Sequence, residues 1–334
     1  MGIKHIKLMS SEVAQLWTSY INSSMSRCLF TYFFGIVEDT EIQSIIKHGL
    51  ELSESHIQKL TAIFQKEGHP VPYGFHVEED VNTSAPRLFS DNFILFFIHN
   101  MGIPALNFYA FSKTLVARSD IDSYFSECLL ELKDYDTMAK NLLLSRGLYI
   151  RSPFVVPPNE VNFVKDQNWM ADLFGKKRPL SVIEITNLFS NFQNNALGYA
   201  TMMGYSQVAQ SKEVGEFMLR GKEIAFKHMK VFGSVLEEDN LPVPMTWDIG
   251  ITDSTVAPFS DKMMMFMTTA LIALSIGYYA TSMATSMRRD VSLLYLKLSA
   301  EIASYAEDGA AIMIQNGWLE EPPLSLNRDQ LANQ

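Results

Sequence analysis

Two histidines at matching places in the chain have the residue type and surroundings that chemistry would require. His56 and His228 each lie on an apolar stripe with helical spacing, so both are predicted to point into a helical core. A buried imidazole is costly unless its nitrogens find hydrogen-bond partners. The sequence therefore predicts a polar cluster around each histidine.

The predicted partners of the histidines also occur twice. Near the end of each half a glutamate is followed one helical turn later by a tyrosine, and an asparagine recurs on the first helix of each half. The candidate clusters are His56, Glu131, Tyr135 and Asn22 in the first half, and His228, Glu301, Tyr305 and Asn194 in the second. Ser23 and Asn195, which follow the two asparagines, recur as well. Each cluster is interpreted either as a buried hydrogen-bonded network or as a small pocket in which histidine and glutamate move a proton.

A carboxylate-bridged di-iron site is not predicted. In a helical bundle such a site takes a Glu-x-x-His pair from each of two helices and one further glutamate from each of the others. Ser53 and Ala225 stand where the glutamates of those pairs would be, and residues 92–119 and 262–289 contain no acidic residue. We expect no catalytic residue, no metal site and no cofactor. A single transition-metal ion with water ligands in each bundle is the alternative that the donor set leaves open.

The chain is an internal duplication. One constant shift of the sequence against itself aligns Glu12 with Glu184 and the Pro-Val-Pro motif at 70–72 with the one at 242–244. After a small deletion in the second copy, a slightly shorter shift aligns Phe-Ser-Asp at 89–91 with the same letters at 259–261. The match continues to the glycines at 147 and 317. One gap over most of each half indicates a repeated structural unit.

Each half is predicted to form four helices. In the first half the first helix covers about residues 11–37, and the second starts at Thr40 and stops at Gly68. The third begins at Ser90 or Asp91, the fourth runs from the motif at 118–122 to Gly147, and the second half repeats them. Gly68 and the Pro-Val-Pro motif end the second helix, because glycine supplies a left-handed cap and proline cannot continue a helix. Thr40 with Gln43, and Ser181 with Glu184, are predicted capping boxes, and Ser90 or Asp91 caps the third helix.

The connection lengths predict the topology. Short links make helices one and two, and helices three and four, into antiparallel hairpins, and the segment between helices two and three can span the bundle. The predicted fold is all-α, a tandem duplication of a ferritin-like four-helix bundle. We assign residues 1–151 to the first bundle, 152–179 to a linker packed on the bundles, and 180–334 to the second bundle and a C-terminal tail. Arg118 with Asp120, and Arg288 with Asp290, are expected to form local ion pairs at the turn between helices three and four.

Composition excludes several classes of protein. The net charge of −10 and the lack of a basic cluster argue against nucleic-acid binding. Two cysteines are too few for a disulfide framework, so a reducing, cytoplasmic location is expected. Residues 92–112 and 263–287 are apolar enough to resemble membrane spans, but a helix that is apolar all round can equally lie inside a bundle. We expect the second situation and no membrane partner.

The repeated motifs resemble a known family. "PVPYGF", "APRLFSD" and "ARSD" in the first half, and "LPVPMTWD", "APFSDKMMMF" and "YAEDGAAIMIQNGWLE" in the second, are similar to those of uncharacterised proteins from endospore-forming bacteria. The resemblance covers almost the whole chain. It implies tandem ferritin-like bundles, and some members carry the label "putative spore coat protein", which implies association with the spore.

Three functions are compatible with these observations. The first is a non-enzymatic structural or interaction protein, associated with the spore coat, that binds other proteins or itself. The second is a ferritin-like metal-binding oxidoreductase with a reduced ligand set. The third is a binding protein whose uncharged third helices line a cavity for an apolar small ligand.

Overall fold

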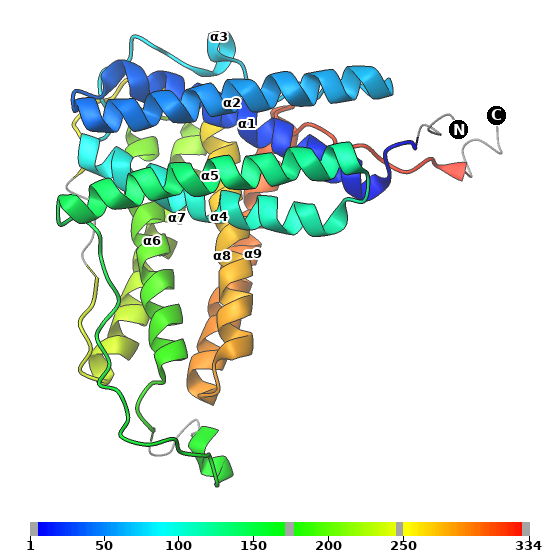
Figure 1. The fold of residues 1–334 in the computed structure, drawn as a ribbon. Coiled ribbons are helices and arrows are strands. Elements are labelled where there is room, and N and C mark those ends of the chain that lie inside the picture. The colour runs from blue at the N-terminus through cyan, green and yellow to red at the C-terminus, as the bar shows by residue number, and fades with distance from the viewer. Residues whose placement is uncertain (1–5, 171–176, 245–249, 329–334) are drawn as a thin grey trace.

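The computed structural model describes residues 6–170, 177–244 and 250–328 and shows two helical bundles (Figure 1). The long helices of the first bundle are α1 (Ser10–Ile36), α2 (Thr40–Glu67), α4 (Asp91–Leu115) and α5 (Ser119–Ser145). Those of the second are α6 (Val182–Val208), α7 (Lys212–Glu238), α8 (Asp261–Thr285) and α9 (Arg289–Gln315). Two short helices, α3 (Val77–Asp80) and η1 (Gln167–Met170), lie in the connections. The predicted all-α tandem repeat is confirmed.

Most helix ends follow the sequence signals. Gly68 ends α2 in the left-handed conformation with φ of 68°. Ser181 and Glu184 form the predicted capping box of α6. The hydroxyl of Ser90 accepts the N–H of Phe93 at 3.3 Å at the start of α4.

The start of α2 differs from the prediction. Asp39, and not Thr40, is the N-cap, and its carboxylate accepts the N–H groups of Glu41 and Ile42 at 3.0 and 3.1 Å. A carboxylate one residue before the helix can reach two free N–H groups and also interacts with the positive end of the helix dipole. Arg146 binds the same carboxylate with two hydrogen bonds of 2.7 and 2.9 Å, which holds it in place.

The turns between the third and fourth helices contain the predicted ion pairs. The guanidinium of Arg118 donates to both oxygens of Asp120 at 2.8 and 2.7 Å. Arg288 binds Asp290 in the same way at 3.0 and 2.7 Å. Bidentate pairs of this kind hold the arginine in one orientation at the start of the fourth helix, because the planar guanidinium matches a carboxylate in a defined geometry.

The two bundles meet through their long connections with approximate two-fold symmetry. Val81 forms a backbone bridge with Phe259, and Phe89 forms one with Ile251. At the shift that aligns Phe-Ser-Asp at 89–91 with 259–261, Val81 corresponds to Ile251 and Phe89 to Phe259, so these two bridges are the same contact made in both directions. The backbone hydrogen bonds of the two connections also repeat in pairs. The N–H of Asn82 donates to the oxygen of Pro258, and the matching N–H of Thr252 donates to the oxygen of Leu88. The N–H of Ser260 donates to the oxygen of Asp80, and the matching N–H of Ser90 donates to the oxygen of Gly250. A two-fold arrangement uses one surface patch twice.

Apolar packing also continues across this contact. The ring of Phe259 lies 6.5 Å from that of Phe33, and the matching rings of Phe89 and Tyr205 lie 6.3 Å apart. Buried residues of both bundles belong to one continuous core, and a second, smaller core lies at the end of the first bundle that contains His56. The bundles run crosswise to one another (Figure 1).

The linker does not pack as predicted. Phe154 and Phe163 are 82% and 80% exposed, whereas a linker packed on the bundles would bury its aromatic rings. Trp169 lies under the guanidinium of Arg178 at 3.9 Å, and Phe174 lies outside the described residues. Prolines at 153, 157 and 158 remove backbone donors and keep this part of the segment extended as it runs alongside the second bundle (Figure 1).

The third helices of the two halves, α4 and α8, are long and apolar enough to cross a membrane. Half of the most apolar window of α4 is buried inside the protein, and 39% of that of α8. In both helices the buried side chains face the bundle core, including Phe93 and Tyr109 on α4 and Met263 and Tyr279 on α8. Bundle packing therefore accounts for part of their apolar character.

Candidate functional site

The first bundle joins His56 to a tyrosine and a glutamate from two other helices. His56 on α2 is 5% exposed, and its Nε2 lies 2.8 Å from Oε2 of Glu131 on α5. The hydroxyl of Tyr109 on α4 lies 3.4 Å from its Nδ1. We call Tyr109, His56 and Glu131 the first histidine network.

The second bundle repeats this arrangement at the equivalent positions. His228 on α7 is fully buried, with Nε2 at 3.1 Å from Oε2 of Glu301 and Nδ1 at 2.9 Å from the hydroxyl of Tyr279. The side-chain amide of Asn195 on α6 donates to the Tyr279 oxygen at 2.7 Å. Tyr279, His228 and Glu301 form the second histidine network, and with Asn195 they connect all four helices of the bundle.

Hydrogen-bond chemistry fixes the direction of each network. A carboxylate only accepts, so the Nε2 that faces it carries the proton, and Nδ1 is left to accept from the tyrosine O–H. In the second network Asn195 donates to the tyrosine oxygen, which completes the sequence from amide to hydroxyl to imidazole to carboxylate. Both nitrogens of His228 are thereby satisfied in the neutral ring.

Burial supports the neutral state of both imidazoles. Burial lowers the pKa of His56 and of His228, and the neighbouring glutamates offset only part of this effect. For Glu301, burial raises the pKa, but hydrogen bonds from Lys227 and His228 lower it by more, so the net shift is downward. The second network is therefore a neutral histidine beside an ionised carboxylate.

A lysine approaches the glutamate of each network from the protein surface. Lys227 donates to both oxygens of Glu301 at 2.7 and 2.8 Å, and Lys59 lies 3.9 Å from Glu131 while it binds Glu127 at 2.7 Å. Lys59 comes three residues after its histidine, whereas Lys227 immediately precedes its own. The positions equivalent to them are Val231 and Ser55. The duplication pattern could not have identified these lysines, because each copy uses a different position.

The predicted tyrosines are not members of the networks. Tyr135 packs edge-on against Phe30, and its hydroxyl has no hydrogen-bond partner among the described residues. Tyr305 donates to the backbone oxygen of Phe217 at 2.8 Å. Four residues advance a helix by about 6 Å, so a tyrosine one turn beyond the glutamate lies too far along the axis to reach the histidine.

A glycine on the second helix of each half accommodates each of these tyrosines. A Cβ on Gly49 would lie 2.8 Å from the Tyr135 hydroxyl, and one on Gly221 would lie closer still to that of Tyr305. Both distances are shorter than those that Cβ atoms show in proteins. The tyrosine hydroxyls therefore occupy space that only a glycine leaves open at these positions.

The predicted asparagines also differ from the residues that the structure places inside. Asn22 and Asn194 are half-buried, and Asn194 lines a cavity near α4. One residue further turns a helix by about 100°, which brings Ser23 and Asn195 to face the core. Asn195 binds Tyr279, and Ser23 interacts with Tyr109.

Tyr109 and Tyr279 are the network members that sequence reasoning missed. They occupy equivalent positions in the two copies, so a signal for them was present. Their helices lack acidic residues after the first turn, so the sequence predicts only an apolar lining from α4 and α8. A tyrosine in an apolar helix has a hydroxyl that needs a partner, and the histidine of the same bundle can accept from it.

Three metal-ligating side chains gather in the first bundle. The ligand atoms of His56, Cys128 and Glu131 lie within 4.8 Å of one another. Burial raises the pKa of the Cys128 thiol to about 12, and a thiol binds metals as the thiolate. The imidazole is already bonded on both sides, and Lys59 adds a positive charge beside Glu131. The second bundle has Leu298 at the position of Cys128.

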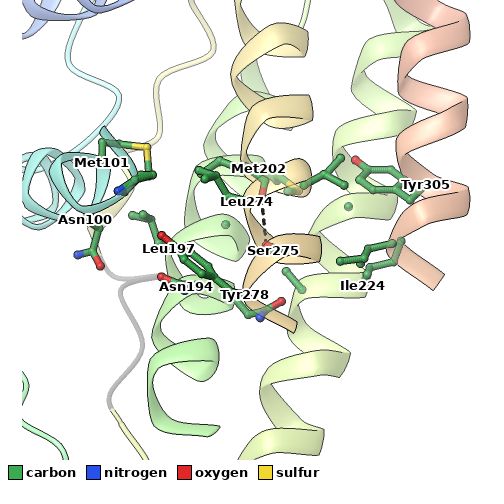
Figure 2. A pocket seen from close by; sticks show the side chains of 18 residues that line it. Asn100, Met101, Asn194, Leu197, Met202, Ile224, Leu274, Ser275, Tyr278 and Tyr305 are labelled. Atoms are coloured by element: carbon green, nitrogen blue, oxygen red, sulfur yellow. Dashed lines mark hydrogen bonds between the residues drawn. The ribbon is translucent and has the colours of Figure 1, made fainter. Parts of the chain in front are cut away.

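A small cavity lies where α4 meets the second bundle. It measures about 50 Å³ and is lined by Asn100 and Met101 on α4 and by Asn194, Ser275 and Tyr278 on α6 and α8, among others (Figure 2). A buried water molecule needs about 10–15 Å³ of such space, so this cavity has room for a few waters. The third helices therefore do contribute to a cavity, but one too small for an apolar ligand of ordinary size.

The fold and the networks define a class of protein: an all-α tandem repeat in which each four-helix bundle contains a buried tyrosine–histidine–glutamate network. The chain belongs to the family described as "Protein of unknown function (DUF3231)", whose model matches residues 2–161 and again residues 168–331. The two matches correspond to the two bundles.

One solved structure is similar to part of the chain. It is described as the "crystal structure of a putative spore coat protein" from Bacillus halodurans and is 14% identical, with a TM-score of 0.42. The similarity covers 45% of this chain and 98% of that protein. No curated protein matches the chain.

Proposed function

We propose that this protein is a non-enzymatic structural protein of ferritin-like fold that binds other proteins and contributes to the spore coat. The main support is the saturation of the second histidine network. Each polar atom that His228 offers is used inside the bundle, and its ring is fully buried. A group that handles protons or metals needs access to a substrate or a free lone pair, whereas a satisfied buried network specifies one packing of a core.

The linker supplies a surface for protein contacts in this proposal. Its aromatic side chains Phe154 and Phe163 are exposed on an extended segment, with Val156 and Val161 also exposed between them. Extended apolar segments bind partners by backbone pairing and by side-chain insertion into pockets. The spore location itself rests on the resemblance of the sequence motifs, and before incorporation into the spore the protein is proposed to be soluble in the cytoplasm.

The test is the location of the protein in sporulating cells. A tagged protein should fractionate with the extracted coat, and the double variant Phe154→Ser, Phe163→Ser should remain in the soluble fraction. Phe111→Ser, which changes an aromatic residue of α4 that is 59% exposed, should fractionate as the unmodified protein does. The proposal is contradicted if the protein is absent from purified spores. It is also contradicted if the double variant at Phe154 and Phe163 has the same location as the unmodified protein.

A metal-binding oxidoreductase is the second candidate, favoured only by the group His56, Cys128 and Glu131. Protein purified without chelators would then contain one transition-metal ion per chain, and Cys128→Ala would lose it. We expect less than a stoichiometric amount of metal in both proteins, because the thiol is protonated and the imidazole already hydrogen-bonded. Stoichiometric metal that depends on Cys128 would replace the structural proposal for the first bundle.

A further inference from the structure

A second cavity lies between the first bundle and the end of the second. It measures about 270 Å³. Aromatic side chains form much of its wall: Trp17 on α1, Tyr73 and Phe75 from the Pro-Val-Pro-Tyr-Gly-Phe segment after α2, Phe266 on α8, and Trp318 after α9. Walls of this kind favour a flat apolar body, which they contact over both faces and edges.

One end of this cavity already binds a carboxylate. The N–H groups of Tyr73 and Gly74 donate to the two oxygens of Glu320 at 3.0 and 2.9 Å. Gly74 has φ of 63°, and successive N–H groups around a left-handed residue converge on one point and form an anion site. Glu320 comes from the segment after α9 and is half-buried.

The anion site is rigidly held by α1. The hydroxyl of Ser24 accepts the N–H of Phe75 at 3.1 Å, and Arg27 donates to the Phe75 oxygen at 3.2 Å. A Cβ on Gly74 would collide with the Ser24 hydroxyl, so no other residue fits at this turn. The two donors therefore keep their direction whether or not Glu320 is in place.

A lysine adds positive charge beside the anion site. Lys262 on α8 donates to the oxygen of Gly74 at 2.9 Å, and its ammonium lies 4.7 Å from the centre of the Phe75 ring. It also pairs with Asp80 across 3.8 Å. The cavity thus combines aromatic walls, two directed N–H groups and a nearby cation.

We propose that this cavity is a binding site for a small aromatic carboxylate. The carboxylate of the ligand replaces that of Glu320 on the N–H groups of Tyr73 and Gly74, and its ring lies among the aromatic side chains. A cavity of about 150 Å³ accommodates benzene, so 270 Å³ suits a ligand of about ten non-hydrogen atoms. Glu320 holds the anion position until the ligand arrives. This site is separate from the histidine networks and independent of the proposed structural role.

The experiment compares phenylacetate with phenylacetamide, a neutral molecule of the same shape, by titration calorimetry and ligand-observed NMR on the full chain. Phenylacetate should bind more tightly by on the order of tenfold, because charge-assisted hydrogen bonds are roughly twice as strong as neutral ones. Equal affinities for the acid and the amide, or no binding of either, overturn the proposal.

Variants locate the site and separate its parts. Glu320→Ala removes the competing carboxylate and should tighten phenylacetate binding several-fold, whereas Glu321→Ala, at the exposed neighbouring position, should leave it unchanged. Lys262→Met should reduce the preference for the acid over the amide, and Trp318→Ala should weaken both. Thermal unfolding checks that each variant is folded. Binding that Glu320→Ala leaves unchanged or weakens contradicts the assignment even if Trp318→Ala fails to fold.

Discussion

Nε2 of His228 on α7 lies 3.1 Å from Oε2 of Glu301 on α9. The imidazole of His228, which lies between Glu301 and Tyr279, is fully buried. His228→Ala would leave the carboxylate and the tyrosine without this partner and would open a cavity. We expect a loss of about 2–4 kcal/mol in the free energy of unfolding, from the unsatisfied polar groups and the cavity together. Urea denaturation measures it.

The control for this variant is Glu223→Ala, an exposed position on the same helix. It should change stability by no more than about 0.5 kcal/mol. Size-exclusion chromatography should give the same elution volume for the unmodified protein and both variants, because the histidine is buried inside its bundle. A His228→Ala protein as stable as the unmodified one would show that the network does not stabilise the bundle.

Stability should fall as the pH is lowered from 7 towards 5. Burial holds the pKa of His56 and His228 below the ordinary value of 6.5, so the unfolded chain binds more protons than the folded one in this range. The stabilisation is complete above pH 6.5 and is lost as the pH falls through the lowered pKa values. The net downward shift of Glu301 acts in the same direction at lower pH.

Chemical denaturation at a series of pH values measures this dependence. The double variant His56→Gln, His228→Gln should be less stable at pH 7 and should show a smaller change between pH 7 and pH 5. His69→Gln, near the end of α2 and outside the networks, should keep the full change. A double variant with an undiminished change would mean that other groups cause it.

Two conservative tyrosine substitutions should have opposite effects. Tyr279→Phe removes a hydroxyl that accepts from Asn195 and lies against His228, and should cost about 1–2 kcal/mol. Tyr135→Phe removes a buried hydroxyl without a partner among the described residues, and should be neutral or stabilising by up to about 1 kcal/mol. Thermal and urea denaturation compare the two. Equal losses of unfolding free energy in the two variants would show that the Tyr135 hydroxyl does belong to a polar cluster, as the sequence predicted.

Limited proteolysis should cut the chain in the linker first. Chymotrypsin cleaves after aromatic residues, and Phe154 and Phe163 are more than three-quarters exposed. The two fragments should stay together on size-exclusion chromatography, because backbone bridges and a continuous core join the bundles. Fragments that separate without denaturant would show that the linker, and not the interface, holds the bundles together.

The sequence predicted the duplication, the helices and the inward direction of both histidines, since each depends on local spacing. Glu131 and Glu301 lie on the stripe that faces α2 and α7, which explains why the structure brings them to the histidines. The remaining partners depend on distances across the bundle. Tyr135 shares a stripe with Glu131 but lies one turn too far along, and Lys59 and Lys227 reach equivalent carboxylates from non-equivalent positions. The exposure of the linker could not be predicted from its apolar residues, because burial requires a complementary surface that the local sequence does not reveal.

The two-fold contact between the long connections has an evolutionary consequence. In a symmetric pair of separate chains, every substitution appears on both sides at once, whereas a fused pair lets one side change while the other keeps the original residue. The two halves differ in this way: His99 pairs with Asp136 at 2.8 Å inside the first, at positions where the second has Thr269 and Ala306. Joining the copies end to end thus lets the interiors of the two halves differ while the backbone contacts that hold them together keep their two-fold pattern.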